Sequence, residues 1–254
     1  MTAKFDPSKF TTTQPKPLPV VLVLDRSGSM AEAFDSSGVG ARSKITVLNE
    51  AVKRMLKTLS NEESPASEFL LSVITFGGNA RLDFSPSPAS TFVFQELSAG
   101  GNTPLGAALE VAKNLIEDRN LTPSRAYRPL VVLISDGLPN DEWQTSMQAF
   151  VGSGRSAKCD RMALGVGEDS ITGGGRLVLD LFVSDTNRAV FEAKDADSIH
   201  KFFKFVTMSV VTRSLSVNPD EVPDDAVVKV PTSSAKVTAP NAEQELPDDE
   251  DSYW

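Results

Sequence analysis

Hydrophobic and polar positions follow two different spacings along this chain, and segments of the two kinds alternate. Short runs without polar residues, such as Val20–Leu24, are typical of strands buried on both faces. Longer segments, such as residues 43–59, repeat hydrophobic residues every three or four positions, which is the spacing of one helix face. Strands are expected at residues 20–24, 69–76, 80–84, 130–134, 161–166 and 189–192. Helices are expected at residues 43–59, 104–116, 142–150, 176–182 and 196–213.

Strands that alternate with helices predict an α/β fold in which helices cover both faces of a mostly parallel sheet. The expected architecture has three layers and is doubly wound, so that ligands bind beyond the carboxyl ends of the strands. Only Gly77-Gly78-Asn79 separates the second and third expected strands, and so short a link predicts a hairpin. The sheet should therefore include one antiparallel strand at its edge.

Composition divides the chain into three parts. Residues 1–17 are polar and rich in Pro, Thr and Lys, and we expect them to form a flexible arm. Residues 18–216 carry the alternating pattern of one domain. From residue 217 to 254 the pattern stops, and five prolines with scattered acids predict a disordered acidic tail. The tail has ten acidic residues and two lysines, so it holds −8 of the formal net charge of −9.

The charge and the rare residue types argue against several classes of function. The chain before the tail is almost neutral and has no basic patch, which argues against nucleic-acid binding. No hydrophobic run is long enough to span a membrane, and none resembles the core of a signal peptide. The single cysteine excludes an internal disulfide, and the single histidine argues against a zinc site or a catalytic triad. We therefore expect a cytoplasmic protein without membrane contact.

Oxygen-bearing side chains follow the strands at three places. Asp25, Ser27 and Ser29 come directly after the first expected strand, Thr103 lies in a glycine loop before a helix, and Asp136 follows the strand at residues 130–134. Because the carboxyl ends of parallel strands meet at one edge, these residues should lie close together. Two carboxylates and three hydroxyls suit Mg²⁺, with Mn²⁺ and Ca²⁺ as alternatives, and leave one position for an incoming oxygen.

These three segments, D-x-S-G-S at Asp25, G-G-N-T-P around Thr103 and S-D-G at Asp136, resemble the metal-ion-dependent adhesion site of von Willebrand factor A (vWA) domains. The resemblance spans roughly residues 18–213 and implies the three-layer, Rossmann-like vWA fold. It implies that Ser27, Ser29 and the threonine bind the metal directly, and that the two aspartates bind it directly or through water. It also implies a protein partner whose Asp or Glu completes the metal sphere.

The last expected helix narrows the resemblance within that family. Residues 199–211 are similar to the F-F-K-W-V-S-x-S-V ending of the bacterial TerY-like branch, with Phe205 in place of the usual tryptophan. That branch accompanies tellurium-resistance-type stress operons, protein kinases and PP2C-type phosphatases. The resemblance thus implies an adaptor or regulator in a bacterial stress-response or defence system. The alternative is a regulatory subunit of an AAA+ ATPase or chelatase-type complex.

An enzyme that uses the same metal, such as a phosphohydrolase, is the weaker hypothesis. Asp25 ends a strand as in haloacid-dehalogenase phosphatases, but Ser27 stands where that chemistry needs a second aspartate. The segments that carry the site contain no further general base. Gly173-Gly174-Gly175 lacks the rest of a phosphate-binding motif, and we expect it to form a flexible loop. A protein without catalytic residues is therefore expected.

The acidic tail allows more than one role. It is either a solubilising extension or a docking segment, because two aromatic residues follow the acids of Asp248–Trp254 and suit a partner's basic groove. A further hypothesis is that a tail carboxylate caps the metal. The loops at residues 33–42 and 172–175 are expected to contact the partner. Other conspicuous side chains are expected to be structural only: Cys159, His200, Phe202, Phe203 and Phe205.

Overall fold

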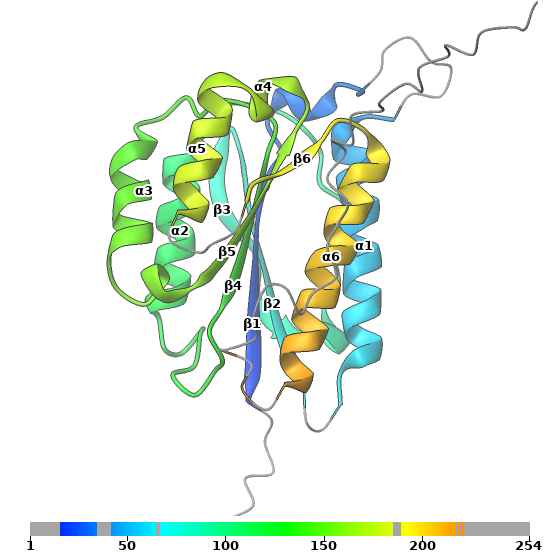
Figure 1. Cartoon of the computed structure of the whole chain (residues 1–254), viewed down its shortest axis with the longest axis vertical. Coiled ribbons are helices and arrows are strands. Elements are labelled where there is room, and N and C mark those ends of the chain that lie inside the picture. The colour runs from blue at the N-terminus through cyan, green and yellow to red at the C-terminus, as the bar shows by residue number, and fades with distance from the viewer. Residues whose placement is uncertain are drawn as a thin grey trace, which may run out of the picture.

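Six strands form one mixed sheet in the order β3-β2-β1-β4-β5-β6 in the computed structural model (Figure 1). The structure describes residues 16–34, 42–64, 67–184, 189–216, 218 and 220. Neighbouring strands run parallel, except that β2 and β3 are antiparallel. This confirms the predicted α/β fold with one antiparallel edge strand. The strands are β1 (Pro17–Asp25), β2 (Glu68–Gly77), β3 (Asn79–Pro88), β4 (Leu130–Ser135), β5 (Asp160–Val166) and β6 (Phe191–Ala193).

Helices lie on both sides of this sheet and complete three layers (Figure 1). The α-helices are α1 (Lys44–Glu62), α2 (Leu105–Glu117), α3 (Trp143–Gly152), α4 (Glu168–Ile171), α5 (Gly173–Val183) and α6 (Ala196–Leu215). Short 3₁₀ helices are η2 (Gly28–Ala31), η3 (Ala89–Thr91) and η4 (Ser156–Lys158). Figure 1 shows α1 and α6 on one face and α2, α3 and α5 on the other, with α4 above the carboxyl ends of the strands.

The residues of the central strand β1 show why helices must pack on both faces of the sheet. Its side chains point alternately to the two faces, and every one of its residues is buried. Leu22 and Leu24 belong to the core under α1 and α6, whereas Val21 and Val23 belong to the core under α2, α3 and α5. A strand without a polar face stays out of water only in such a sandwich.

One local prediction was wrong, because residues 173–175 form the first turn of α5 instead of a flexible loop. The short last strand is present, but it covers Phe191–Ala193 instead of residues 189–192. Gly175 has a packing reason, because a Cβ there would lie 2.4 Å from the carbonyl oxygen of Asp169. Glycine therefore lets α5 begin directly after α4, a short helix that the sequence pattern did not predict.

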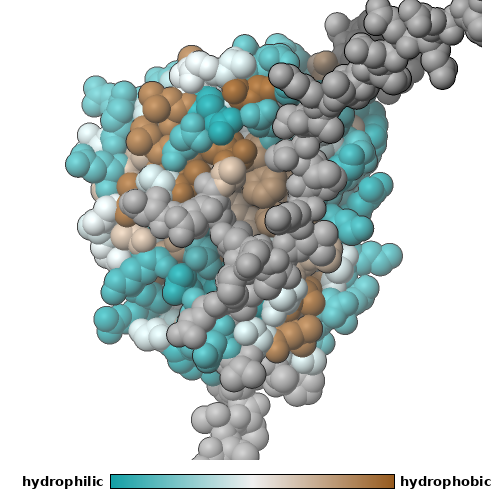
Figure 2. Space-filling view, in the orientation of Figure 1, coloured by the Kyte–Doolittle hydropathy of each residue, from teal (hydrophilic) through white to brown (hydrophobic). Residues whose placement is uncertain are grey.

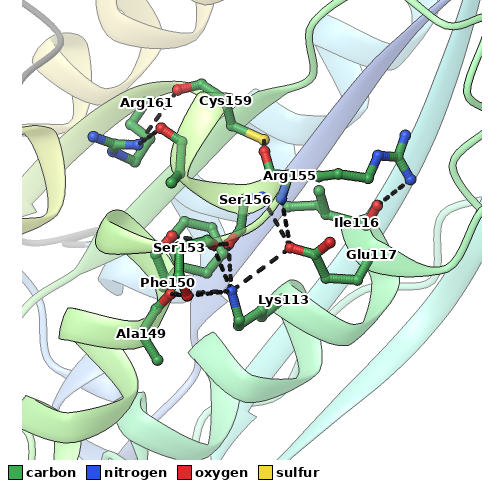
Figure 3. Close-up of polar contacts among 11 residues, drawn as sticks. Lys113, Ile116, Glu117, Ala149, Phe150, Ser153, Arg155, Ser156, Cys159 and Arg161 are labelled. Carbon is green, nitrogen blue, oxygen red and sulfur yellow. Dashed lines mark hydrogen bonds and ion pairs between the residues drawn. The ribbon is translucent and has the colours of Figure 1, made fainter.

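Polar contacts at the amino ends of the strands hold the segment between α3 and β5 (Figure 3). Lys113 on α2 donates hydrogen bonds to the carbonyl oxygens of Ala149 (3.0 Å) and Ser153 (2.7 Å), at the end of α3. One carboxylate oxygen of Glu117 accepts from the backbone N–H groups of Arg155 (2.7 Å) and Ser156 (3.2 Å). These contacts satisfy exposed backbone groups and are structural.

The side chains expected to be structural have packing roles. Phe202 and Phe203 are buried in the core under α6, and Phe205 packs against Phe191 with ring centroids 5.0 Å apart. Burial raises the pKa of the Cys159 thiol to about 12, so this thiol is unreactive at neutral pH. Nε2 of the half-buried His200 lies 3.8 Å from a carboxylate oxygen of Glu50, on α1.

Some predictions fall outside the described residues. These are the arm before residue 16, most of the loop at residues 33–42, and the acidic tail apart from Asn218 and Asp220. Within the part that the structure describes, no helix has the length and apolar character needed to cross a membrane.

Candidate metal centre

The turn after β1 gathers the first three predicted ligands. Asp25 is the last residue of β1, and its Oδ1 accepts a hydrogen bond from the backbone N–H of Ser27 at 2.8 Å. Helix η2 then turns the chain so that the hydroxyl oxygens of Ser27 and Ser29 lie 3.1 Å apart. One turn therefore brings a carboxylate and two hydroxyls to the carboxyl edge of the sheet.

The end of the neighbouring strand β4 brings the second carboxylate to the same place. Leu24 pairs with Ile134, so Asp25 and Ser135 leave the sheet side by side. The Ser135 hydroxyl donates to Oδ2 of Asp25 at 2.7 Å, and the Ser29 hydroxyl donates to Oδ1 of Asp136 at 2.7 Å. Four of the five predicted ligands are thus linked by short hydrogen bonds.

Thr103 reaches this edge through its backbone. Its loop is fixed by hydrogen bonds from Gly28 N–H to the Gly101 carbonyl (2.9 Å) and from Gly100 N–H to the Arg26 carbonyl (2.7 Å). In the described part of the chain, the Thr103 hydroxyl makes no hydrogen bond with the other four residues. The structure therefore sets the Thr103 loop against the turn after β1, while a role for its hydroxyl stays a prediction.

Two residues of the loop after β4, missed by sequence reasoning, hold Thr103 and the start of α2. Oδ1 of Asn140 accepts from the Thr103 N–H at 3.1 Å. The carboxylate of Asp141 accepts from the N–H groups of Gly106 (3.1 Å) and Ala107 (3.0 Å), and so caps α2. The side chain of Thr103 does not cap α2, because these N–H groups bond to Asp141. An Asp or Asn distant in sequence gives no spacing signal for such a cap.

Lys44 is the third residue that sequence reasoning missed. It is the first residue of α1, and its side chain is only 10% exposed. Its Nζ donates to Oδ2 of Asp136 at 3.0 Å and lies 3.7 Å from the exposed carboxylate of Glu32. Nothing in the spacing of the helix distinguishes Lys44 from the exposed lysines of the same helix, such as Lys53.

The two aspartates are buried, with exposed fractions of 0% for Asp25 and 2% for Asp136. Burial, and then the neighbouring charge of Asp136, raise the pKa of Asp25 from 3.8 to about 6. Hydrogen bonds from Ser27 and Ser135 act in the opposite direction without cancelling this rise. Asp25 therefore loses its proton only near neutral pH, and its ionised form is stabilised by any cation that binds beside it.

This set of donors fits a hard divalent cation. Among the described residues, no cluster of three or more His, Cys, Asp and Glu could hold a metal ion. A centre at this edge would thus rest on two carboxylates and neutral hydroxyls, which is oxygen chemistry suited to Mg²⁺. The residues that would hold the ion are those predicted from sequence: Asp25, Ser27, Ser29, Thr103 and Asp136.

Comparison with solved structures relates this fold to known ones. A von Willebrand factor type A protein from Catenulispora acidiphila is 18% identical, and the match covers 78% of this chain and 43% of that chain with a TM-score of 0.55. The PilB minor pilin from Streptococcus sanguinis is 15% identical, with 79% and 62% covered and a TM-score of 0.55. Proximal thread matrix protein 1 from the mussel byssus, in a structure with a zinc-occupied MIDAS motif, is 16% identical, with 77% and 48% covered and a TM-score of 0.53.

The chain spans 48%, 62% and 43% of the length of three of the structures that it matches, which is about half. No curated protein has a significant sequence match to this chain. Its residues 20–138 match the family model of the von Willebrand factor type A domain, and this segment includes all five predicted ligands. This match covers residues 20–138 alone, and together with the six-stranded sheet it shows that this part of the chain has a von Willebrand factor type A-like fold.

Proposed function

We propose that this domain is a metal-dependent protein-interaction module, and that its partner supplies an aspartate or a glutamate to the metal. One observation carries the proposal. The turn after β1 and the loop after β4 are joined by the hydrogen bond from Ser29 to Asp136 (2.7 Å), and they gather only oxygen donors around it. Such a group of oxygen donors suits a hard divalent ion.

The two carboxylates and the hydroxyls would have different effects on a bound ion. Asp25 and Asp136 offset the charge of a dication, whereas the neutral hydroxyls of Ser27, Ser29 and Thr103 leave it attractive to a further oxygen ligand. Mg²⁺ is the ion that we propose, with Mn²⁺ and Ca²⁺ as alternatives. The zinc-occupied MIDAS motif of the mussel protein supports a divalent ion in this fold.

A partner needs more than one carboxylate for useful affinity, because most binding energy comes from the surrounding interface. Leu138 lies two residues beyond Asp136 and is 59% exposed. On α5, Leu177 (58% exposed) and Leu181 (42% exposed) are four residues apart and so lie on one side of the helix. Figure 2 shows hydrophobic residues gathered where Figure 1 places α5 and β6. We propose that apolar contacts with these leucines accompany the contact with the metal.

We further propose that the module is an adaptor or regulator and not an enzyme. The similarity of residues 199–211 to the TerY-like branch supports a stress-response or defence system in which the partner is a kinase or a PP2C-type phosphatase. A regulatory role beside an AAA+ ATPase is the alternative. The identity of the protein that the module binds separates the two, because only the alternative requires an ATPase.

The test is affinity capture of partners in Mg²⁺ and again in EDTA. Asp25→Ala and Thr103→Ala should each abolish metal-dependent capture without unfolding the domain, whereas Asp118→Ala should have no effect. Asp118 is a suitable control because it follows the last residue of α2, at the end of the helix away from Thr103. Capture that is equally strong in EDTA and in both variants would contradict the proposal.

A further inference from the structure

Lys44 occupies an unusual place for a lysine. Among the lysines that the structure describes, it alone is buried, and its ammonium group lies at the edge where the predicted ligands meet. The Nζ atom is 3.0 Å from Oδ2 of Asp136 and 3.5 Å from the carbonyl oxygen of Ser29. A buried ammonium group in such a position acts on every other charge in the centre.

The fold holds Lys44 in this position. Its backbone N–H donates to the carbonyl oxygen of Glu32 at 2.9 Å, so the start of α1 is tied to the segment after η2. Gly167, at the end of β5, lies against the side chain, and a Cβ there would be 3.4 Å from both Cε and Nζ of Lys44. The lysine thus lies in a narrow space between segments that follow β1, β4 and β5. An exposed, freely moving lysine would not have these contacts.

The charges of the buried groups suggest what Lys44 does. Asp25 and Asp136 together can carry two negative charges, and Lys44 already neutralises one of them. A dication on the same two carboxylates would therefore leave the ion and the buried groups with an excess of one positive charge. The carboxylate of Glu32, 3.7 Å from Lys44, is 72% exposed and screened by solvent, so it offsets this excess only weakly, and a single carboxylate from outside would neutralise it.

We infer that Lys44 is a resident cation that makes metal binding and carboxylate binding depend on each other. This inference rests on the proposed function and adds to it. Lys44 weakens the binding of a dication when no anion is present, and an anionic ligand restores that binding. By thermodynamic linkage, the metal strengthens carboxylate binding by the same factor. The Lys44 ammonium group and the metal ion would be two positive charges on the carboxylate of Asp136, in a partly buried site. Their repulsion should lower the affinity for the metal by about tenfold or more.

The experiment is a titration of the full chain with Mn²⁺, followed by electron paramagnetic resonance, in sodium chloride and in sodium acetate of equal ionic strength. Acetate is the carboxylate probe, and the Mn²⁺ that it binds in solution is subtracted. Lys44→Gln removes the charge but keeps a hydrogen-bond donor for Asp136. Lys53→Gln is the control, because Lys53 is an exposed lysine of the same helix that pairs with Glu96.

Lys44→Gln should bind Mn²⁺ at least about tenfold more tightly than the wild type in chloride. Acetate should increase the Mn²⁺ affinity of the wild type and of Lys53→Gln several-fold. It should increase the Mn²⁺ affinity of Lys44→Gln much less. Equal or weaker Mn²⁺ binding by Lys44→Gln in chloride would overturn the inference, as would an acetate effect that is the same in all three proteins. If Lys44→Gln fails to fold, Lys44→Met takes its place, since methionine is uncharged, unbranched and readily buried.

The two proposals fail in different ways. If the wild type binds Mn²⁺ and Lys44→Gln behaves identically, the inference about Lys44 fails while the metal-dependent module stands. If neither protein binds Mn²⁺ in chloride or in acetate, both proposals fail. If Lys44→Gln alone binds Mn²⁺ in chloride and the wild type binds it once acetate is present, both proposals are supported; a wild type that binds no Mn²⁺ even in acetate contradicts both.

Discussion

At the scale of single residues, Asp25 and Asp136 place two carboxylates where water does not reach them. The hydrogen bonds from Ser27 and Ser135 offset only part of the cost of burying Asp25, so the pKa of Asp25 stays raised at about 6. A buried carboxylate of this kind lowers the stability of the metal-free fold at neutral pH and favours a bound cation. The same residues therefore reduce stability and supply the proposed function.

The first prediction concerns pH. Because the pKa of Asp25 rises from 3.8 to about 6 on folding, its contribution to stability is full below 3.8 and is lost as the pH rises through 6. The loss amounts to about 3 kcal/mol without metal. Asp25→Asn should remove this part of the pH dependence and make the metal-free protein more stable at pH ~7.5, measured by denaturant unfolding. Identical pH profiles for the wild type and the variant would contradict this.

At the scale of elements, the candidate centre depends on how a glycine loop packs against two strand ends. Gly101 has a φ of +79°, and a Cβ on it would lie 2.4 Å from the backbone nitrogen of Gly78. Its neighbour Gly100 has no atom within 4 Å of the corresponding position. The two glycines are adjacent in sequence, yet only one of them is needed for the close approach of the loop to the β2–β3 hairpin.

Gly101→Ala should therefore destabilise the fold by about 2–4 kcal/mol and weaken metal binding, because the Thr103 loop must move away. Gly100→Ala should change stability by less than about 1 kcal/mol. Thermal unfolding and Mn²⁺ titration of the two variants provide the comparison. Equal effects of the two substitutions would show that backbone packing at Gly101 does not position the loop.

Asp141 allows a second test at the level of elements. Asp141→Ala removes the cap of α2 and should cost about 1 kcal/mol of unfolding free energy. Asp195→Ala is the matched control, because Asp195 caps α6 through the Ser198 N–H at 2.7 Å. Both variants should lose similar stability, but only Asp141→Ala should also weaken Mn²⁺ binding, since the start of α2 adjoins Thr103. Unchanged Mn²⁺ affinity in Asp141→Ala would argue against this coupling.

Particular residues show what the sequence could and could not predict. The buried strand at Val20–Leu24 and the helix after Ser43 follow from local spacing, which is why the layers and the antiparallel edge strand were predictable. The convergence of Asp25 with Asp136 followed from the rule that parallel strands end at one edge. The positions of Lys44 and Asp141 depend on how distant segments pack, and short-range patterns carry no information about that.

At the scale of the whole molecule, the candidate centre and the start of the tail lie at opposite edges of the sheet. Helix α6 runs back from the carboxyl edge (Figure 1), and Asp220 accepts a hydrogen bond from the Arg128 N–H, just before β4, at 2.7 Å. The nine residues of β1 correspond to about 30 Å between the two edges. The 34 residues after Asp220 can span about 110 Å when extended, so a tail carboxylate has the length to reach the metal.

The hypothesis that the tail caps the metal leads to a prediction for the chain cut after Asp220, which keeps the contact with Arg128. A synthetic peptide of residues 241–254 should bind the shortened chain in Mn²⁺ and not in EDTA, and the full chain should bind it more weakly. Fluorescence anisotropy of a labelled peptide gives its affinity for both chains. Binding that is equally strong in EDTA would rule out the metal contact.

The most direct measurement of the central claim is the number of divalent ions that the chain binds. Mn²⁺ titration of the full chain in acetate at pH ~7.5 should reveal one site, which disappears in Asp25→Asn and in Asp136→Asn and persists in Asp180→Asn. A wild type that binds no Mn²⁺ at millimolar concentration, or a site that survives both substitutions, would contradict the account.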